Sequence, residues 1–476
     1  MIKKKSNEGF LRGVNYSDPV LNYRTDKIHS TLKKVTGKNL NMSKTFIADT
    51  FNTHYLPAPI PKSIHEIPEE KALEYEVFKA VYDSPIVEEN RSYTVANSTV
   101  SMALTVSFLE NLIKELEEKK KSASAEVKEV AEQLLDQLVS GGKASKGSQQ
   151  AGKKQQSKGK GNEGNQDSQK EQAGNNAGDV KKSVIMEAVT NALKKATEDA
   201  KNVAMLQKLV SNNAGVGHTI SFEDNIDKAL ELARNTDVKK ILKLLRGMPK
   251  LSIAKKKRTV KFSKGEITGY EFGSDLERVV PTELALPDEV FYSKFAESQL
   301  LLYERRLKEE EGAIHVLLDK SGSMEGEKII WAKAVAMALF NKARKENREF
   351  YIRFFDEYPH DLVKVPKNVK SEDVLKLVEY IGKVSAGGGT DITRAIVTAT
   401  EDIRQGKVKG TSDIILITDG EDEISEEKVL KELKRANANL ISIGVRCENP
   451  SLKKVSTKFF SVYALNEDDI IQIMEE

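Results

Sequence analysis

The last third of the chain alternates short apolar runs with longer segments whose apolar residues recur at helical spacing. The runs that have the length and composition of buried strands are Ala313–Leu318, Phe350–Phe355, Asp413–Thr418, Leu440–Val445 and Phe459–Val462. Helical periodicity fills most of the intervals, as in 327–344 and 392–403, and a last helix is expected from about Asn466. This alternation predicts an α/β fold over 310–476, with a doubly wound, mainly parallel sheet.

Helical spacing of apolar residues dominates the chain before residue 310. In the N-terminal part the predicted helices are Leu73–Val81, Val100–Leu116 and Val127–Leu138. In the middle part they are Val184–Leu209, Ile226–Ala233, Val238–Leu245 and a helix from Asp288 to about Lys308. The sequence therefore predicts two largely α-helical regions ahead of the α/β domain.

A polar segment separates these two helical regions. From Gly141 the chain consists mainly of Gly, Lys, Gln, Ser and Asn, with almost no apolar residue. Such a segment buries too little apolar surface to offset the entropy cost of ordering it, so we expect a disordered linker. The predicted organisation is a helical N-terminal domain (1–140), a linker (141–181), a helical middle region (182–309) and the α/β domain (310–476).

Composition narrows the class of protein. The chain of 476 residues has 31% charged residues but a formal net charge of only +3, which gives no global field favouring nucleic acid or acidic lipid. Its single cysteine, Cys447, excludes an intramolecular disulfide and a multi-cysteine zinc site. No apolar stretch follows the basic N-terminus, and no run has the length needed to span a bilayer. We expect a soluble, cytoplasmic protein.

Candidate chemistry begins where the first predicted α/β strand ends. Asp319, Ser321 and Ser323 form a D-x-S-x-S motif in the loop between that strand and the next helix, where open α/β sheets place their sites. One carboxylate and two hydroxyls with this spacing can converge on a small hard cation, which prefers oxygen ligands. They carry too little charge to hold a divalent ion tightly, so further ligands are expected.

Two later loops offer them. Thr390 follows three glycines at a helix start, and Asp419 follows the strand Asp413–Thr418. Serine and aspartate also serve as turn and capping residues, so D-x-S-x-S alone would be weak evidence. The whole set, in this chain order and in these strand–loop–helix settings, resembles the metal-ion-dependent adhesion site of von Willebrand factor A (VWA) domains. The positions that match are Asp319, Ser321, Ser323, Thr390 and Asp419.

The VWA resemblance implies further features. The three hydroxyls would coordinate Mg²⁺ or Mn²⁺ directly, and the two aspartates would bind it directly or through waters. A free coordination position would take a Glu or Asp of a partner protein. VWA folds also usually have a short antiparallel edge strand, which we assign to His360–Val365.

A second, more specific resemblance comes from the segment Gly273–Leu286, which reads G-S-D-L-E-R-V-V-P-T-E-L-A-L. Together with the C-terminal VWA pattern and the polar linker, it resembles intracellular proteins of the ViaA/CoxE type. That resemblance implies an adaptor rather than an enzyme, with no catalytic residues. Its partner would be a MoxR-type AAA+ ATPase, with that ATPase's protein substrate, in a chaperone or metal-cofactor-insertion system.

Two other functions stay open at this point. A metal-dependent hydrolase would need a base or nucleophile at the site. We find none tied to it, because His315 lies within a predicted strand and His360 lies on the predicted edge strand. An RNA-binding protein would fit the lysine-rich segments, which could contact nucleic acid. The helical regions show no fixed-period repeat, however, and the net charge is small.

Overall fold

The structure, a computed structural model, describes residues 9–140, 167–211, 221–246, 259–308, 311–406, 410–420 and 422–475. The chain forms two compact units. One comprises Met1–Leu242 and Lys370–Gly382, and the other comprises Lys243–Val369 and Lys383–Glu476. No helix in the described ranges is long and apolar enough to cross a membrane.

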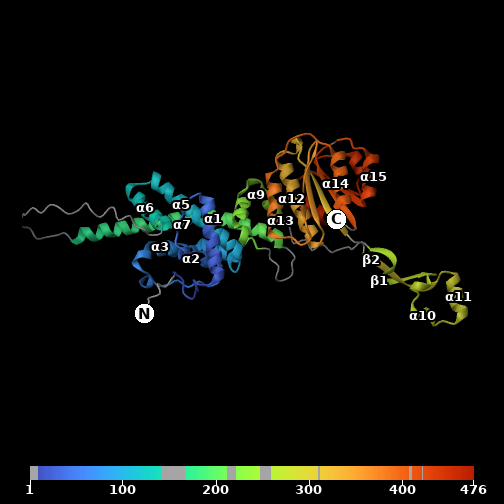
Figure 1. Ribbon diagram of the computed structural model, residues 1–476, viewed down its shortest axis with the longest axis horizontal. Coiled ribbons are helices and arrows are strands. Elements are labelled where there is room, and N and C mark those ends of the chain that lie inside the picture. The colour runs from blue at the N-terminus through green and yellow to red at the C-terminus, as the bar shows by residue number, and fades with distance from the viewer. Residues whose placement is uncertain are drawn as a thin grey trace, which may run out of the picture. The chain divides into compact units, whose positions relative to one another are not determined.

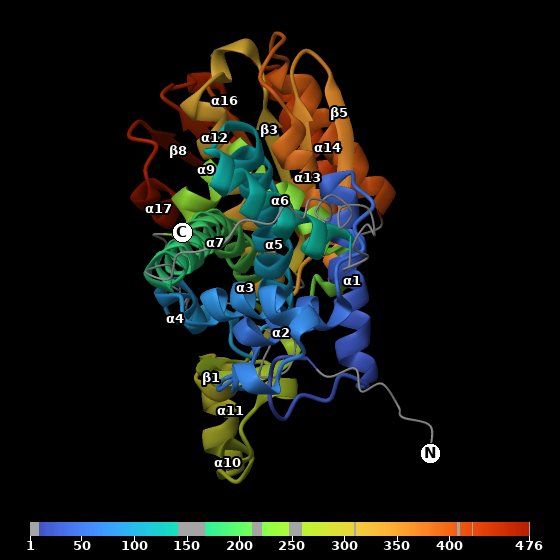
Figure 2. The same ribbon diagram turned by 90° about the vertical axis from the view of Figure 1, so that its left-hand side faces the viewer.

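The first unit is α-helical, as predicted (Figure 1). Its longer helices are α1 (Pro19–Thr36), α2 (Lys44–Tyr55), α3 (Ala72–Tyr82), α4 (Pro85–Thr94), α5 (Ser98–Ser122), α6 (Ala125–Ser140), α7 (Asp167–Ser211), α8 (Ile226–Arg234), α9 (Thr236–Arg246) and α13 (Ser371–Lys383). Figure 2 shows α5 at the centre of this unit, with α1 and α7 packed beside it. The helix is almost continuously buried from Thr99 to Leu116, because several neighbouring helices cover it.

A polar network joins three helices of this unit. Arg234 of α8 pairs with Asp199 of α7 at 2.7 Å and with Glu110 of α5 at 2.8 Å. Ser107 of α5 donates a hydrogen bond of 2.8 Å to the same Asp199 carboxylate. Glu110 and Asp199 are buried, and the positive charge of the Arg234 guanidinium compensates their negative charges.

Helix α7 begins earlier than the sequence predicted. It starts at Asp167 rather than near Val184, so residues 167–181 of the predicted linker are helical. The rest of that linker, 141–166, lies outside the described residues. The early turns mix good helix formers with Gly174 and Gly178, and they extend the helix because lengthening an existing helix costs far less than starting one.

A β-hairpin replaces part of the predicted helical middle region. Strands β1 (Thr259–Gly273) and β2 (Leu300–Lys308) pair antiparallel, with the short α10 (Pro281–Leu284) and α11 (Asp288–Ala296) between them. The helix expected to run from Asp288 to Lys308 therefore ends at Ala296. The chain turns at Ser298, which has a φ of 58°, and the apolar residues that follow pair with β1.

The α/β fold predicted for the C-terminal region is confirmed. Its sheet has the strand order β5-β4-β3-β6-β7-β8, and every neighbouring pair is parallel except β4 with β5. The strands are β3 (Glu311–Asp319), β4 (Phe350–Phe355), β5 (Pro359–Val365), β6 (Thr411–Thr418), β7 (Ala438–Val445) and β8 (Lys458–Val462). The antiparallel edge strand predicted at His360–Val365 is thus present as β5.

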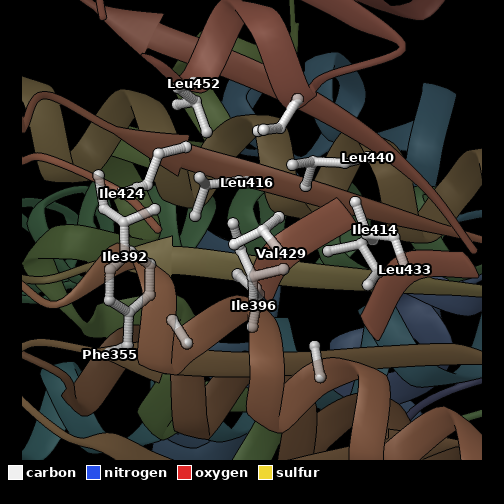
Figure 3. Packing of buried hydrophobic residues seen from close by; sticks show 14 of the residues in the cluster. Phe355, Ile392, Ile396, Ile414, Leu416, Ile424, Val429, Leu433, Leu440 and Leu452 are labelled. Atoms are coloured by element: carbon white, nitrogen blue, oxygen red, sulfur yellow. The ribbon is translucent and has the colours of Figure 1, made fainter. Parts of the chain in front are cut away.

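Helices cover both faces of this sheet. They are α12 (Glu327–Lys345), α14 (Ile392–Gly406), α15 (Glu426–Ala436), α16 (Pro450–Val455) and α17 (Glu467–Glu475). Figure 3 shows one side of the core, where Ile414, Leu416 and Leu440 of the sheet pack against Ile396 of α14 and Val429 of α15. Helix α12 packs against β3 and β4, with Phe340 in edge contact with Phe350. The sheet is therefore held rigidly between two apolar layers.

The buried side chain of Arg348 links the amino-terminal ends of β3 and β6. Arg348, which is 7% exposed, donates hydrogen bonds of 2.6 Å to the Gly312 carbonyl and 3.3 Å to the Ala313 carbonyl of β3. It also pairs at 2.7 Å with Asp413 of β6. This one side chain therefore links β3 to β6 at the edge opposite the D-x-S-x-S loop.

We predict that Arg348→Ala lowers the free energy of unfolding by about 3 kcal/mol, because it removes a buried guanidinium and leaves the partly buried Asp413 carboxylate with only the hydrogen bond from Asn439. Arg435→Ala is the matched control, since Arg435 is 53% exposed in its pair with Glu432. Its loss should cost about 1 kcal/mol or less. Chemical denaturation of both variants checks the prediction, and equal losses would contradict it.

Candidate metal site at the carboxyl edge of the sheet

The topology of the sheet brings the two predicted aspartates together. β3 and β6 are parallel neighbours, and Leu318 is paired with Ile417 in their register. Asp319 ends β3, and Asp419 follows β6 after Thr418, so both carboxylates lie at the same edge of adjacent strands. This is the edge where open α/β sheets bind ligands.

Asp319 is fixed by hydrogen bonds to both of its carboxylate oxygens. Its Oδ1 accepts a bond of 2.8 Å from the Ser321 backbone N–H, and its Oδ2 accepts one of 2.5 Å from the Thr418 hydroxyl. The side chain is fully buried. Burial raises the pKa of Asp319 above its usual value, and the hydrogen bonds from Thr418 and Ser321 offset only part of that shift.

A chain of oxygen atoms runs from Ser321 to Asp419. The Ser321 and Ser323 hydroxyls lie 3.1 Å apart, and Ser323 donates a hydrogen bond of 2.7 Å to Asp419 Oδ1. Lys328, near the start of α12, pairs with Asp419 Oδ2 at 2.6 Å and also donates to the Ser323 carbonyl at 3.2 Å. The Lys328 ammonium group thus places a positive charge next to the Asp419 carboxylate, whose side chain is nearly buried.

The glycine-rich loop packs directly against the D-x-S-x-S loop. Gly387 N–H donates a bond of 2.6 Å to the Lys320 carbonyl, and Gly322 N–H donates one of 3.0 Å to the Gly388 carbonyl. Gly388 has a φ of +97°, and a Cβ added there would lie 3.0 Å from the Cβ of Asp356. Both the backbone conformation and the close approach favour glycine at this position.

Thr390 reaches the same edge of the sheet. A Cβ added at Gly420 would lie 3.2 Å from the Thr390 methyl carbon and 3.8 Å from Asp319 Oδ2. Thr390 and Asp319 therefore both lie close to Gly420, on the side to which a side chain there would point. All the residues predicted for the site come from loops that meet at one place, although they span a hundred positions of the sequence.

Several residues that hold the site were not singled out from the sequence. Thr418 bonds Asp319 and accepts a bond of 2.9 Å from the Gly420 N–H. Asn449 is buried at the start of α16 and donates bonds of 3.4 Å to the Gly420 carbonyl and 3.0 Å to the Asp422 carbonyl. The bond from Thr418 to Asp319 and those from Asn449 to the loop after β6 join different elements, so no local motif predicts them.

An ion-paired cluster borders the glycine-rich loop. Asp356 Oδ2 lies 2.8 Å from both Lys320 Nζ and His360 Nε2. Burial alone would raise the pKa of Asp356, but hydrogen bonds from Lys320, the Tyr358 backbone and His360 lower it well below its usual range. His315 lies elsewhere, buried in β3 and stacked on Tyr351, and burial lowers its pKa to about 3.

The donor set of the site is made of oxygen atoms alone. Two carboxylates and three hydroxyls suit a hard cation such as Mg²⁺ or Mn²⁺ better than a soft metal. Within the described ranges, no group of three or more His, Cys, Asp or Glu side chains is arranged to hold a metal ion. The candidate site differs from such groups because most of its donors are neutral.

Comparisons with known proteins agree with this architecture. Residues 312–457 match the family model described as von Willebrand factor type A domain. The uncharacterized protein MJ0811 of Methanocaldococcus jannaschii is 31% identical over 317 residues, which are 63% of this chain and 71% of that protein. The chain belongs to the same family as MJ0811. Its C-terminal region is a VWA domain.

Two further similarities were found. The uncharacterized protein MJ0077 of the same organism is 28% identical over 276 residues, which are 55% of this chain and 69% of that protein. Among solved structures, a von Willebrand factor type A protein from Catenulispora acidiphila has 19% sequence identity and a TM-score of 0.29. That match covers 36% of this chain and 43% of the other.

Removing the Thr418 hydroxyl tests how the VWA site is held. We predict that Thr418→Val lowers the free energy of unfolding by about 1–3 kcal/mol, because the buried Asp319 carboxylate loses the hydrogen bond from the Thr418 hydroxyl. Thr398→Val should change it by about 0.5 kcal/mol or less, since that hydroxyl bonds only the Arg394 carbonyl at an exposed helix position. Denaturation at neutral pH compares the two, and a Thr418→Val protein as stable as wild type would contradict the prediction.

Proposed function

We propose that this protein is a metal-dependent adaptor whose VWA domain binds an acidic residue of a partner protein. The observation that supports the proposal is that oxygen atoms of Asp319, Ser321, Ser323 and Asp419 lie together at one edge of the sheet, in the loops next to Thr390. The residues that would hold Mg²⁺ or Mn²⁺ are Asp319, Ser321, Ser323, Thr390 and Asp419. VWA domains typically mediate protein–protein interactions, which fits a binding role.

The charge balance of the site supports an acidic ligand. Three of its donors are neutral hydroxyls, and Lys328 already neutralises part of the Asp419 charge. A divalent ion held there would keep much of its positive charge and would attract a carboxylate from outside. A partner's Glu or Asp would provide that carboxylate, and the ion would then join the two proteins.

We further propose a MoxR-type AAA+ ATPase as the partner. The support is the resemblance of Gly273–Leu286, combined with the C-terminal VWA domain, to proteins of the ViaA/CoxE type. In such a system the adaptor would connect the ATPase with its protein substrate, in a chaperone or metal-cofactor-insertion role. The proposal assigns no catalytic residue to this chain.

Metal binding is the first test of the proposal. We expect the full-length protein to bind Mn²⁺ weakly, and Asp319→Ala to abolish binding, because a buried carboxylate at the centre of the donor set is lost. Asp468→Ala removes an exposed carboxylate of α17 and should leave binding unchanged. Mn²⁺ electron paramagnetic resonance measures the bound fraction, after circular dichroism has shown that both variants fold. Full Mn²⁺ binding by Asp319→Ala would refute the metal site.

Partner binding is the second test. Ser323→Ala, Thr390→Ala and chelation with EDTA should each weaken binding to a MoxR-type ATPase by about tenfold or more, a loss of about 1.4 kcal/mol or more. The control Thr398→Ala removes a hydroxyl from the exposed side of α14 and should bind like wild type. Surface plasmon resonance with the immobilised ATPase gives the Kd values. An unchanged Kd in EDTA and in both site variants would rule out the metal site as the docking point.

A further inference from the structure

Lys328 places a positive charge of the chain itself at the candidate metal site. Its Nζ lies 2.6 Å from Asp419 Oδ2 and donates a hydrogen bond of 3.2 Å to the Ser323 carbonyl. The Asp419 side chain is only 2% exposed, whereas that of Lys328 is 26% exposed. The carboxylate is therefore fixed inside the protein, while the lysine side chain keeps contact with water.

The position of Lys328 in its helix is electrostatically unfavourable. Helix α12 begins at Glu327, after Gly326, so Lys328 lies in its first turn. The partial positive charge at the amino terminus of a helix favours acidic side chains there and disfavours lysine. The helix alone thus gives no reason for a lysine at this position, whereas the neighbouring Asp419 carboxylate does.

The two aspartates of the site are compensated in different ways. The Asp319 carboxylate accepts hydrogen bonds from the Ser321 backbone N–H and the Thr418 hydroxyl, which are neutral donors. The Asp419 carboxylate accepts one from the neutral Ser323 hydroxyl on Oδ1, and its Oδ2 pairs with the lysine ammonium. One of the two carboxylates is therefore already paired with a cation that belongs to the chain.

Other basic side chains near the site have different partners. Lys320 pairs with Asp356, and the guanidinium of Arg394 lies 4.6 Å from the centre of the Tyr358 ring. Within the part of the chain that the structure describes, Lys328 is the only basic side chain that forms an ion pair with a proposed metal ligand. Its charge therefore acts on the site directly.

We propose that Lys328 is an intramolecular competitor of the metal ion and sets the affinity of the site. This inference rests on the proposed metal site and concerns its regulation. A divalent ion that binds beside Asp419 either displaces the ammonium group from Oδ2 or binds next to it. Displacement costs the ion pair, and binding next to it costs the repulsion between two cations. In both cases the oxygen donors hold the ion less tightly than they would without the lysine.

A competing lysine makes retention of the ion depend on the partner. The ion alone has to offset the cost that Lys328 imposes, so it binds weakly. A carboxylate of a partner protein adds a negative charge to the ion and stabilises it, so the site would hold its ion firmly only in the complex. A monovalent cation carries no more charge than the ammonium group that it would replace, so the lysine also favours divalent ions over Na⁺ and K⁺.

Removing the charge of Lys328 tests the proposal. Lys328→Gln keeps a hydrogen-bond donor, and Lys328→Met keeps only an apolar side chain of similar length. Both full-length variants should bind Mn²⁺ about tenfold more tightly than wild type, because a positive charge that opposes the ion is gone. Mn²⁺ electron paramagnetic resonance gives the Kd values, after circular dichroism has shown which variants fold. A lysine that merely supported the loops would give the opposite sign, since its loss would weaken metal binding.

Two control variants isolate the charge at this position. Lys328→Arg keeps the positive charge and should bind Mn²⁺ no more tightly than wild type. Lys79→Gln removes a lysine that pairs with Asp83 at an exposed position of α3, and it should leave the Kd for Mn²⁺ unchanged.

Thermal denaturation provides a second readout. Without metal, Lys328→Gln should melt at a lower temperature than wild type, because the nearly buried Asp419 carboxylate loses its charged partner. The same concentration of Mn²⁺ should raise the Tm of Lys328→Gln by more than it raises that of wild type, because the ligand that binds more tightly stabilises the native state more.

The possible failures can be told apart. If wild type binds Mn²⁺ as tightly as Lys328→Gln and Lys328→Met do, or more tightly, the competitor role is wrong and the metal site stands. If Lys328→Arg binds as tightly as Lys328→Gln, the positive charge is not the cause and the competitor role is again wrong. If neither wild type nor any variant binds Mn²⁺, the metal site itself is wrong, and this inference with it.

Discussion

The parallel pairing of β3 with β6 is the constraint on which the rest of the candidate site depends. It fixes the two strand ends side by side, so that Asp319 and the residues after Thr418 occupy one edge. Arg348 ties the same two strands at their opposite ends through Asp413 and backbone carbonyls. The glycine-rich loop then closes on the D-x-S-x-S loop through backbone hydrogen bonds, and Thr390 follows this loop at the same edge.

The negative charge of the site is only partly compensated within the protein. Lys328 lies within 2.6 Å of Asp419, and Asp319 is held by neutral donors in a buried position. A cation entering the site would compete with the Lys328 ammonium for the same carboxylate. If the partner's carboxylate binds the ion, as proposed, metal affinity and partner affinity are linked: each ligand increases the affinity for the other by the same factor.

Much of the C-terminal fold could be predicted from the sequence, and the reasons are physical. The strands of a buried parallel sheet are continuous apolar runs, as in Phe350–Phe355, and their ends are marked by polar loops. The five proposed ligands could be named because their spacing is local to three loops. Thr418 and Asn449 could not, because each acts on a partner from another element, and only the folded chain brings them together. The β2 strand was missed because Leu300–Leu302 follows α11 closely, and its apolar residues also suit a helix until the pairing with β1 is known.

Helix α13 makes the first unit discontinuous in sequence. It lies between β5 and α14 along the chain, yet it belongs to the helical unit, and a Cβ added at Gly382 would lie 3.0 Å from a methyl group of Val238 in α9. The backbone therefore passes between the two units three times. A fragment that began near residue 310 would keep α13 but lose Val238, which lies beside Gly382 at the end of that helix. The start of the α/β fold at residue 311 is thus not the boundary between the two compact units.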